Sequence, residues 1–190
     1  MIPAFLTAGA LIGLMSLPGT ALGAGSENDP PPFQGHWVPF TIIKPLQAAP
    51  ATPLHTLKGG VTTLRRFAGK VVLLNIWATW CPACLYEMPS LDRLQAKIGG
   101  DRFTVVSLSV DRGGANDVLP YLKRLGISRL PVYLDPAGRT AEAIEVHGGL
   151  PWSFIIDHRG RVMGYLKGAG DWESDEGLAL IRYYTRRIPR

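Results

Sequence analysis

Apolar and polar residues alternate along this chain in blocks that predict alternating strands and helices. The clearest block is Val71-Val72-Leu73-Leu74-Asn75-Ile76-Trp77, a short, partly β-branched run typical of a strand buried on both faces. The next block has helical spacing and ends at Gly99-Gly100, with its apolar positions at Met88, Leu91, Leu94 and Ile98. This spacing predicts a helix from about Cys81 to Ile98 that stops at the two glycines.

The same patterns assign most of the remaining chain. They predict strands over 103–110, 130–134, 152–156 and 161–166, and helices over about 118–125, 140–146 and 174–184. Residues 54–63 are expected to form a small hairpin that turns at Lys58-Gly59-Gly60. The fold class is therefore α/β, with a central mixed β-sheet flanked by helices and an N-terminal β-hairpin extension. Ligands meet such sheets at the carboxyl ends of strands, and Cys81 lies just past the strand over 71–77.

The first 24 residues are expected to be a signal peptide or a membrane anchor. No charged side chain occurs before residue 27, and 2–17 are mostly apolar. A stretch of small residues follows, which suits cleavage after Gly23. Because the segment begins without Lys or Arg, an uncleaved anchor stays open beside cleavage. Either outcome places the protein in the periplasm or another extracytoplasmic space, in preference to a cytosolic protein with a buried apolar N-terminal helix.

Composition and charge limit the rest of the organisation. The chain has 190 residues, of which 46% are hydrophobic and 18% charged, which fits one globular domain with appendages. We expect a Pro-rich linker and extension over 25–53, a domain over 54–190, and a monomer. The net charge is +5, but basic residues cluster only at Arg65-Arg66 and near the C-terminus. Because no basic segment is interleaved with aromatic residues, no nucleic-acid partner is expected.

The two cysteines, Cys81 and Cys84, lie three residues apart. A disulfide between them closes almost no loop, so its value is expected to be chemical, although a passive disulfide is the alternative. Backbone N–H groups and the helix dipole at the predicted helix start would lower the thiol pKa of Cys81. Cys84 shares its helix face and can resolve a mixed disulfide. We therefore expect Cys81 to be the exposed nucleophile and Cys84 the more buried resolving thiol.

The same cysteines could also serve as metal ligands. Zinc would need two further ligands, and the four histidines are dispersed along the sequence, which disfavours a structural zinc site. Cu(I) binding by Cys81, Cys84 and a histidine such as His147 stays an alternative, because soft thiolates suit Cu(I). We otherwise expect no metal and no cofactor beyond the redox-active Cys81–Cys84 disulfide.

The sequence around the cysteines resembles a known family. Val72 to Cys84 reads VLLNIWATWCPAC and is followed by Glu87-Met88-Pro89. This resembles the TlpA/ResA/CcmG branch of the thioredoxin superfamily, which are exported thiol–disulfide oxidoreductases. Further similar stretches are VVSLSVDRGG from Val105, LPVYLDPAGR from Leu130 and GLPWSFIIDHRGRV from Gly149. The resemblance extends from about Leu54 to Tyr184 and implies a thioredoxin-like fold and thiol–disulfide exchange.

The resemblance also implies roles for residues outside the cysteine pair. Pro151 falls where the superfamily has a cis-proline that faces the disulfide, so that the backbone of Leu150 can meet a substrate strand; an ordinary trans proline is the alternative. Asn75 stands where cytosolic thioredoxins have a proton-transferring aspartate, and an amide cannot take that proton. Glu87 matches a glutamate of the family pattern and is the next candidate; an exposed surface glutamate is the alternative.

Further candidate residues would contact the substrate. Trp80 precedes the cysteine pair, and Pro82 and Ala83 lie between the two cysteines. Leu150 and Trp152 flank Pro151. We expect Trp80 to offer apolar contact to a substrate and Trp152 to narrow the substrate-binding groove beside the disulfide. Most relatives have proline second between the cysteines. Here Pro82 comes first, as in oxidising DsbA-type centres, and this order predicts a potential less reducing than the value of about −270 mV for thioredoxin.

The function expected from the resemblance is reduction of specific cysteines in exported proteins, in cytochrome c maturation or copper-site assembly. The partners would be protein thiols or disulfides and a membrane electron-donor thiol reductase, because the periplasm is kept oxidising. The alternatives are a dithiol oxidase or isomerase, which the order Pro82-Ala83 favours, and a Cu(I)-binding assembly factor. A peroxidase is disfavoured, since the local pattern of a peroxide-reactive cysteine is absent.

Overall fold

The computed structural model describes residues 29–190. The predicted signal peptide or anchor over residues 1–24 lies outside these residues. Within 29–190 no helix has the length and apolar character needed to cross a membrane.

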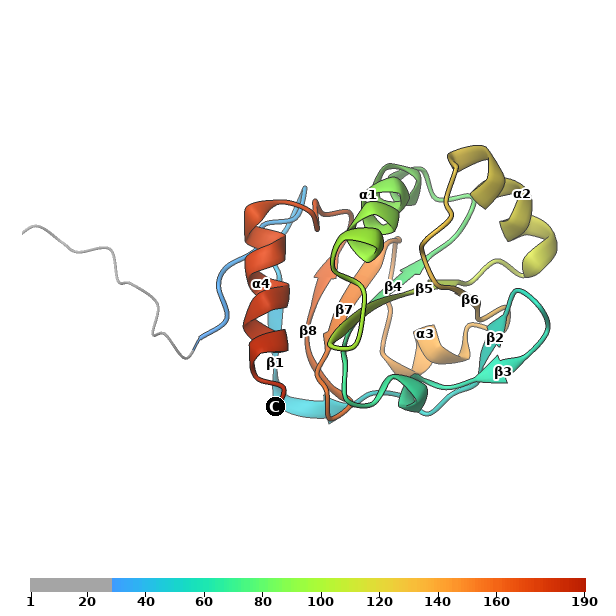
Figure 1. The fold of residues 1–190 in the computed structure, drawn as a ribbon. Coiled ribbons are helices and arrows are strands. Elements are labelled where there is room, and N and C mark those ends of the chain that lie inside the picture. The colour runs from blue at the N-terminus through green and yellow to red at the C-terminus, as the bar shows by residue number, and fades with distance from the viewer. Residues whose placement is uncertain (1–28) are drawn as a thin grey trace, which may run out of the picture.

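The chain alternates strands and helices largely as the apolar pattern predicts (Figure 1). The strands are β1 Thr41–Ala48, β2 Leu54–Thr56, β3 Val61–Thr62, β4 Val71–Trp77, β5 Phe103–Ser109, β6 Val132–Leu134, β7 Trp152–Ile156 and β8 Arg161–Lys167. The helices are the 3-10 helix η1 Leu64–Phe67 and the α-helices α1 Pro82–Ile98, α2 Ala115–Leu125, α3 Arg139–Ala143 and α4 Asp175–Arg186. Most predicted boundaries differ from these by no more than three residues.

The strands form one mixed sheet in the order β1-β8-β7-β4-β5-β6-β2-β3. Strand β4 lies inside the sheet, parallel to β5 and antiparallel to β7. All seven of its residues are buried, which is the environment that its unbroken apolar run predicts. The central mixed sheet of the predicted α/β class is confirmed.

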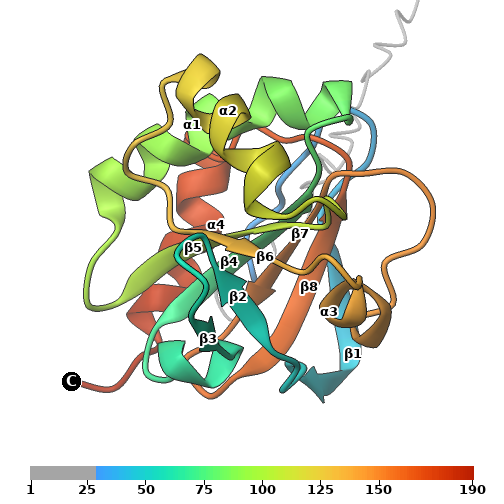
Figure 2. The same cartoon turned by 90° about the vertical axis from the view of Figure 1, so that its right-hand side faces the viewer.

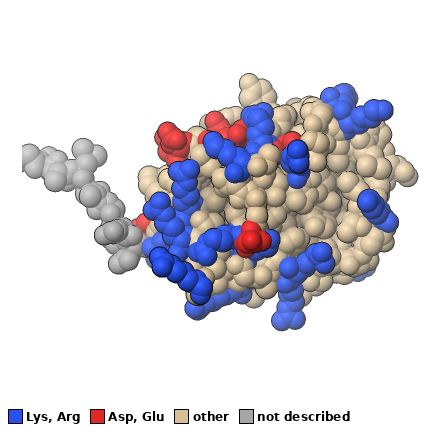
Figure 3. All heavy atoms as spheres, viewed as in Figure 1, with Lys and Arg blue, Asp and Glu red and all other residues tan. Residues whose placement is uncertain are grey.

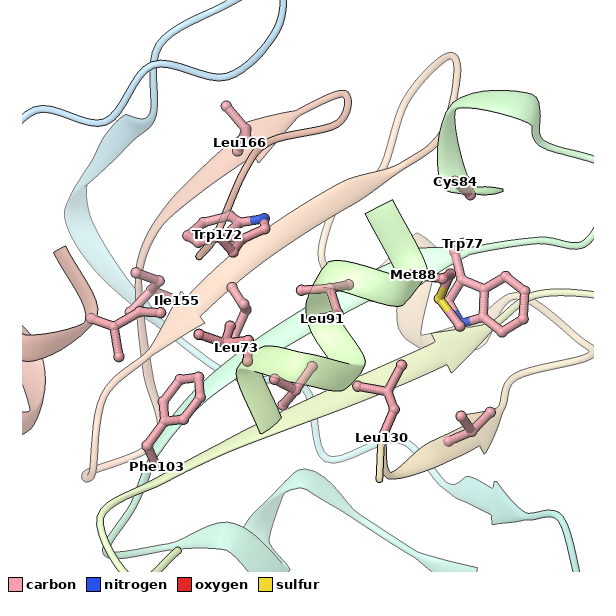
Figure 4. Close-up of a cluster of buried hydrophobic side chains, with 14 of the residues drawn as sticks. Leu73, Trp77, Cys84, Met88, Leu91, Phe103, Leu130, Ile155, Leu166 and Trp172 are labelled. Atoms are coloured by element: carbon pink, nitrogen blue, oxygen red, sulfur yellow. The ribbon is translucent and has the colours of Figure 1, made fainter. Parts of the chain in front are cut away.

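Helices cover both faces of the sheet (Figure 2). On one face, Leu73 and Trp77 of β4 belong to a core cluster with side chains of α1, α2 and α4 (Figure 4). On the other face, Leu74 and Ile76 pack in a second cluster with Ile144, the residue that caps α3. Met88, Leu91 and Leu94 are fully buried on the inner side of α1, as their spacing predicts.

Part of the segment that the sequence assigned to a linker and extension belongs to the folded sheet. Strand β1 pairs antiparallel with β8 at one edge, and the predicted hairpin, β2–β3, lies at the opposite edge. Phe33 is buried and its ring lies 4.5 Å from that of Trp172. In Figure 1 the residues before β1, drawn in blue, lie beside α4. The core therefore draws residues from well before position 54.

Basic side chains gather over one part of the surface. Figure 3 shows Lys and Arg concentrated around the lower part of α4, on the side where the C-terminus lies. Arg182, Arg186 and Arg190 line one hollow there together with Arg102. Arg182 and Arg186 belong to α4 itself, so these two residues form a basic face of that helix.

Candidate active site

The two cysteines form a disulfide at the start of α1. Cys81 is the N-cap of the helix and lies four residues beyond the end of β4, and Pro82 occupies the first helical position. The backbone N–H of Cys84 donates to Cys81 Sγ at 3.2 Å. Strand and helix thus place the Cys81 sulfur where N–H groups and the helix dipole favour a negative charge. This location matches the chemistry predicted for a reactive thiolate.

Both cysteines are buried, which differs from the exposed Cys81 that the sequence predicted. Cys81 is 4% exposed and Cys84 1% exposed. The physical reason is that Cys81 Sγ is bonded to Cys84, and both side chains join the core cluster under α1 (Figure 4 shows Cys84 there). The predicted order holds, since Cys84 is the less exposed of the two.

A buried aspartate fixes the loop that leads into Cys81. Thr79 donates its backbone N–H and its hydroxyl to the Asp111 carboxylate, at 2.9 and 2.6 Å. The hydroxyl of Ser109 donates to the same carboxylate at 2.7 Å. Asp111 follows β5, the parallel neighbour of β4, so both strands deliver these groups to one sheet edge. The sequence reasoning missed Asp111, although its place just after a buried strand could have indicated it.

Glu87 is a buried carboxyl one helical turn beyond Cys84. Only 3% of it is exposed, so the alternative of a surface glutamate is wrong. Burial raises its pKa to about 8, a rise that hydrogen bonds from Trp172 and Ser153 partly oppose. At neutral pH the oxidised protein therefore holds a proton on Glu87.

The partners of Glu87 come from three distant parts of the chain. Its Oε1 accepts hydrogen bonds from Trp172 Nε1 at 2.9 Å, Ser153 Oγ at 3.3 Å and Asn75 Nδ2 at 3.4 Å. Asn75 also donates to Ser153 Oγ at 3.0 Å. All four residues are buried. Trp172 and Ser153 were missed by the sequence reasoning, because nothing in the local sequence connects them to Glu87.

The second oxygen of Glu87, Oε2, is buried and has no hydrogen-bond partner among residues 29–190. An ionised carboxylate with one oxygen lacking a hydrogen bond costs more free energy in such a place than a protonated, neutral carboxyl. Asn75 stands where a second acid could have been, but its amide acts only as a donor to Glu87. Glu87 is thus the buried carboxyl of this network and lies one helical turn beyond Cys84.

The peptide bond between Leu150 and Pro151 is cis, as the resemblance implied. Pro151 is buried, and its carbonyl accepts a hydrogen bond from the N–H of Gly168 at 2.7 Å. Strand β7 begins only at Trp152, and the Leu150 backbone makes no hydrogen bond to any residue of 29–190. Its N–H and C=O are therefore not paired with any other group in this part of the chain.

The other predicted contact residues divide into two groups. Trp80 is 68% exposed, Pro82 is exposed and Ala83 is half-buried, so all three present surface next to the disulfide. Trp152 is buried at 8% exposure instead, in the core cluster on the α3 face, where it stacks on Phe154 with 5.9 Å between ring centroids. Because its indole points to that face, Trp152 does not narrow a groove at the cysteines.

The structure gives no support to metal binding at the cysteines. His147 is exposed, and no hydrogen bond or ion pair joins it to the site. Nowhere in residues 29–190 do three His, Cys, Asp or Glu side chains come together as metal ligands.

Comparison with known proteins agrees with this geometry. Residues 45–164 match the AhpC/TSA family. The thiol-disulfide oxidoreductase ResA of Bacillus thuringiensis is 32% identical over 138 residues, which are 72% of this chain and 77% of that protein. The crystal structure of a thiol:disulfide interchange protein of the thioredoxin family from Chlorobium tepidum superposes with a TM-score of 0.60 at 26% identity, covering 75% of this chain and 99% of that one.

A third similar structure is the exposed lipoprotein thioredoxin Etrx1 of Streptococcus pneumoniae, with a TM-score of 0.58 and 26% identity over 70% of this chain and 96% of that one. These likenesses confirm the family resemblance and the thioredoxin-like fold. With the disulfide at the start of α1 and the buried carboxyl behind it, they show what the chain is: a thioredoxin-like thiol–disulfide oxidoreductase that belongs to the AhpC/TSA family.

Proposed function

We propose that this oxidoreductase works outside the cytoplasm as a reductase of specific cysteines in exported proteins. The observation that carries the proposal is the Cys81–Cys84 disulfide above a carboxyl that stays protonated at neutral pH. The apolar N-terminal segment supports export, as does the similarity to an exposed lipoprotein thioredoxin. Cytochrome c maturation and copper-site assembly are the substrate classes that the family resemblance favours.

The reaction begins with the reduced protein. The Cys81 thiolate attacks one sulfur of a substrate disulfide, forms a mixed disulfide and expels the other substrate sulfur as a thiolate, which takes a proton from water. The Cys84 thiol then loses its proton and attacks Cys81 Sγ. The second substrate sulfur leaves as a thiolate and takes a proton from water, and the protein ends with the Cys81–Cys84 disulfide. The substrate gains two electrons and two protons.

Glu87 has a defined task in the second half of this sequence. Cys84 must become a thiolate, and the ionised fraction of Glu87 can take its proton, since the two residues lie one helical turn apart on α1. With a pKa of about 8 this fraction is a minority at neutral pH, and it grows as the pH rises. After this transfer the carboxyl is neutral, which is the form that burial favours in the oxidised protein. The raised pKa makes the ionised carboxyl a stronger base than an exposed carboxylate, which favours proton transfer from Cys84 as the disulfide closes.

The substrate would lie against the backbone of Leu150. The free N–H and C=O of Leu150 can pair with an extended substrate segment, as in the addition of a strand to a sheet edge. Trp80, Pro82 and Ala83 would cover the segment around its cysteine. A membrane thiol reductase would then return electrons to the Cys81–Cys84 disulfide.

One experiment tests both whether the protein exchanges disulfides and whether it reduces or oxidises its substrates. The purified full-length protein, kept in detergent and reduced beforehand, is expected to reduce insulin disulfides, while its oxidised form leaves a reduced dithiol peptide unchanged. Cys81→Ser abolishes the reaction. Cys84→Ser stalls it at the mixed disulfide, so that substrates remain attached to Cys81 and can be identified. Failure of the reduced protein to act on insulin, together with oxidation of the peptide, would overturn the reductase proposal.

A specific observation favours a second candidate, a dithiol oxidase or isomerase. Pro82 precedes Ala83, and this leaves Ala83 with a backbone N–H at the second helical position, where proline would have none. An additional N–H near Cys81 stabilises its thiolate and makes the disulfide more oxidising. Oxidation of the peptide in the same experiment would select this alternative.

A further inference from the structure

A groove of about 690 Å³ opens directly beside the cysteine pair. Three separate parts of the chain form its walls: residues before β1, the first turn of α1 and the loop after β8. Its lining residues are His36, Trp37, Pro82, Ala83, Tyr86 and Ala169. None of them is Asp, Glu, Lys or Arg, so the lining holds no carboxylate, ammonium or guanidinium group.

Two aromatic side chains of this groove lie in solvent. Trp37 is 66% exposed and Tyr86 is 81% exposed. Together with Trp80 they bring three large exposed aromatic rings to the end of the molecule that carries the disulfide. Rings of this kind are enriched where proteins bind other chains, because they gain when a partner removes them from water.

The wall that carries Trp37 is held firmly in place. The indole lies against Gly168 so closely that a Cβ atom there would come within 2.6 Å of Trp37 Cε3. The N–H of His36 donates to the carbonyl of Ala169 at 2.9 Å, and Phe33 is anchored against Trp172. Trp37 is therefore ordered before any partner arrives, which lowers the entropy lost on binding.

The groove is continuous with the reaction centre. Pro82 and Ala83, which line it, are the two residues between Cys81 and Cys84. A substrate held by its cysteine at Cys81 can therefore extend along this surface. Since an extended chain advances about 3.3 Å per residue, the groove would receive a side chain one to a few positions from the substrate cysteine.

We propose that this groove selects substrates by holding an aromatic side chain next to the cysteine under attack. The occupant is an extended segment of the substrate protein, and the absence of carboxylate, ammonium and guanidinium groups from the lining favours an aromatic residue over an acidic or basic one. The proposal rests on the proposed thiol–disulfide reductase function and deepens it. Trp37 is its main determinant, with Tyr86 opposite.

The experiment compares two peptides that differ only in one residue. Each carries one cysteine, bonded as a disulfide to mercaptoethanol. The residue two positions after this cysteine is Trp in the first peptide and Glu in the second. The reduced full-length protein in detergent is mixed with each, and release of the free peptide thiol is followed. The wild type is expected to release the thiol of the Trp peptide about tenfold faster than that of the Glu peptide, which corresponds to about 1.4 kcal/mol of activation free energy.

Three variants make the result specific. Trp37→Ala is expected to bring the two rates to within about twofold of each other, whereas Trp37→Phe keeps most of the preference. Leu119→Ala is the matched control, because Leu119 is an exposed apolar residue of α2 outside the groove. All variants should reduce hydroxyethyl disulfide at the wild-type rate, which shows that the fold and the cysteines are intact.

The outcomes distinguish this inference from the function on which it rests. Equal rates for both peptides, with normal reduction of hydroxyethyl disulfide, overturn the groove proposal alone. No reduction of either peptide or of hydroxyethyl disulfide by the wild type contradicts the proposed function. If Trp37→Ala instead converts a dimer to a monomer in sedimentation and leaves the preference intact, the groove binds a second copy of the chain, and the substrate proposal is wrong.

Discussion

Trp172 Nε1 donates a 2.9 Å hydrogen bond to Glu87 Oε1, although the two residues lie 85 positions apart in the chain. The indole is fully buried, and its ring also packs on Phe33 and Phe40. One side chain thus joins the buried Glu87 carboxyl to the segment before β1. The loop between β8 and α4, which carries Trp172, is therefore part of the redox site as well as of the core.

Replacement of Glu87 by Gln should change how stability depends on pH. The folded pKa is about 8 against a usual value of 4.5, so between these pH values the folded oxidised protein holds a proton that the unfolded chain has lost. The free energy of unfolding therefore falls with rising pH, by about 1.4 kcal/mol per pH unit for this one group. Relative to Glu87→Gln, the wild type should lose stability over this interval.

Urea unfolding of the oxidised protein at several pH values between 5 and 8 measures this difference. Glu142→Gln serves as the control, because Glu142 is exposed on α3. Its unfolding free energy should depend on pH in the same way as that of the wild type. A difference between wild type and Glu87→Gln that stays constant over the whole interval would show that Glu87 is ionised in the folded protein.

Trp172→Phe should raise the pKa of Glu87 above its wild-type value. The indole N–H stabilises the charged carboxylate, and phenylalanine keeps an aromatic ring but has no donor. The pH at which the carboxyl ionises can be followed through its infrared band in the oxidised protein. Phe33→Leu disturbs the same aromatic contact without touching the hydrogen bond, so it should leave that midpoint in place. An unchanged midpoint in Trp172→Phe would mean that the indole does not act on Glu87.

Asp111→Asn should loosen the loop before Cys81. The carboxylate accepts from Thr79 N, Thr79 Oγ1 and Ser109 Oγ, and an amide can replace only some of these acceptor positions. The expected loss is about 1–3 kcal/mol of unfolding free energy, the range for a buried polar group left unpaired. Thr79→Val, which removes only the hydroxyl, should cost less. If Asp111→Asn unfolds at the wild-type denaturant concentration, the loop does not depend on this carboxylate.

Local pattern predicted the elements well, because each depends on its own run of residues. The strand over 71–77 and the helix ending at Ile98 are found where the apolar spacing places them. The cis bond before Pro151 followed from the family resemblance. The burial of Glu87 could not be predicted, since it depends on Trp172 and Ser153, which only the folded chain brings together.

Two differences from prediction have a common physical origin. Trp152 and Trp37 are both large aromatic residues, and the sequence indicated the first as a substrate contact. The alternation of side chains along β7 turns Trp152 to the α3 face, where it is buried. Trp37 comes from a Pro-rich stretch without periodicity, so no pattern revealed that it lies beside α1. Which face a side chain occupies depends on pairing partners that are distant in sequence.

Exchange of the two residues between the cysteines should make the protein a stronger reductant. In the double variant Pro82→Ala with Ala83→Pro, the helix gains an N–H at its first position and loses the one at its second, position 83. An N-cap side chain accepts from the second or third helical N–H, so the loss at position 83 is the one that concerns Cys81. In the oxidised form this N–H has no acceptor among residues 29–190. Without this donor the Cys81 thiolate is less stable, and the disulfide is correspondingly favoured. A hydrogen bond to a charged group contributes about 1.5–3 kcal/mol, which corresponds to a potential lower by about 30–60 mV.

Titration against glutathione measures the potential of both proteins, and we expect the wild-type value to lie above about −270 mV, that of thioredoxin. A double variant with an equal or higher potential would show that the N–H at position 83 does not control the stability of the thiolate.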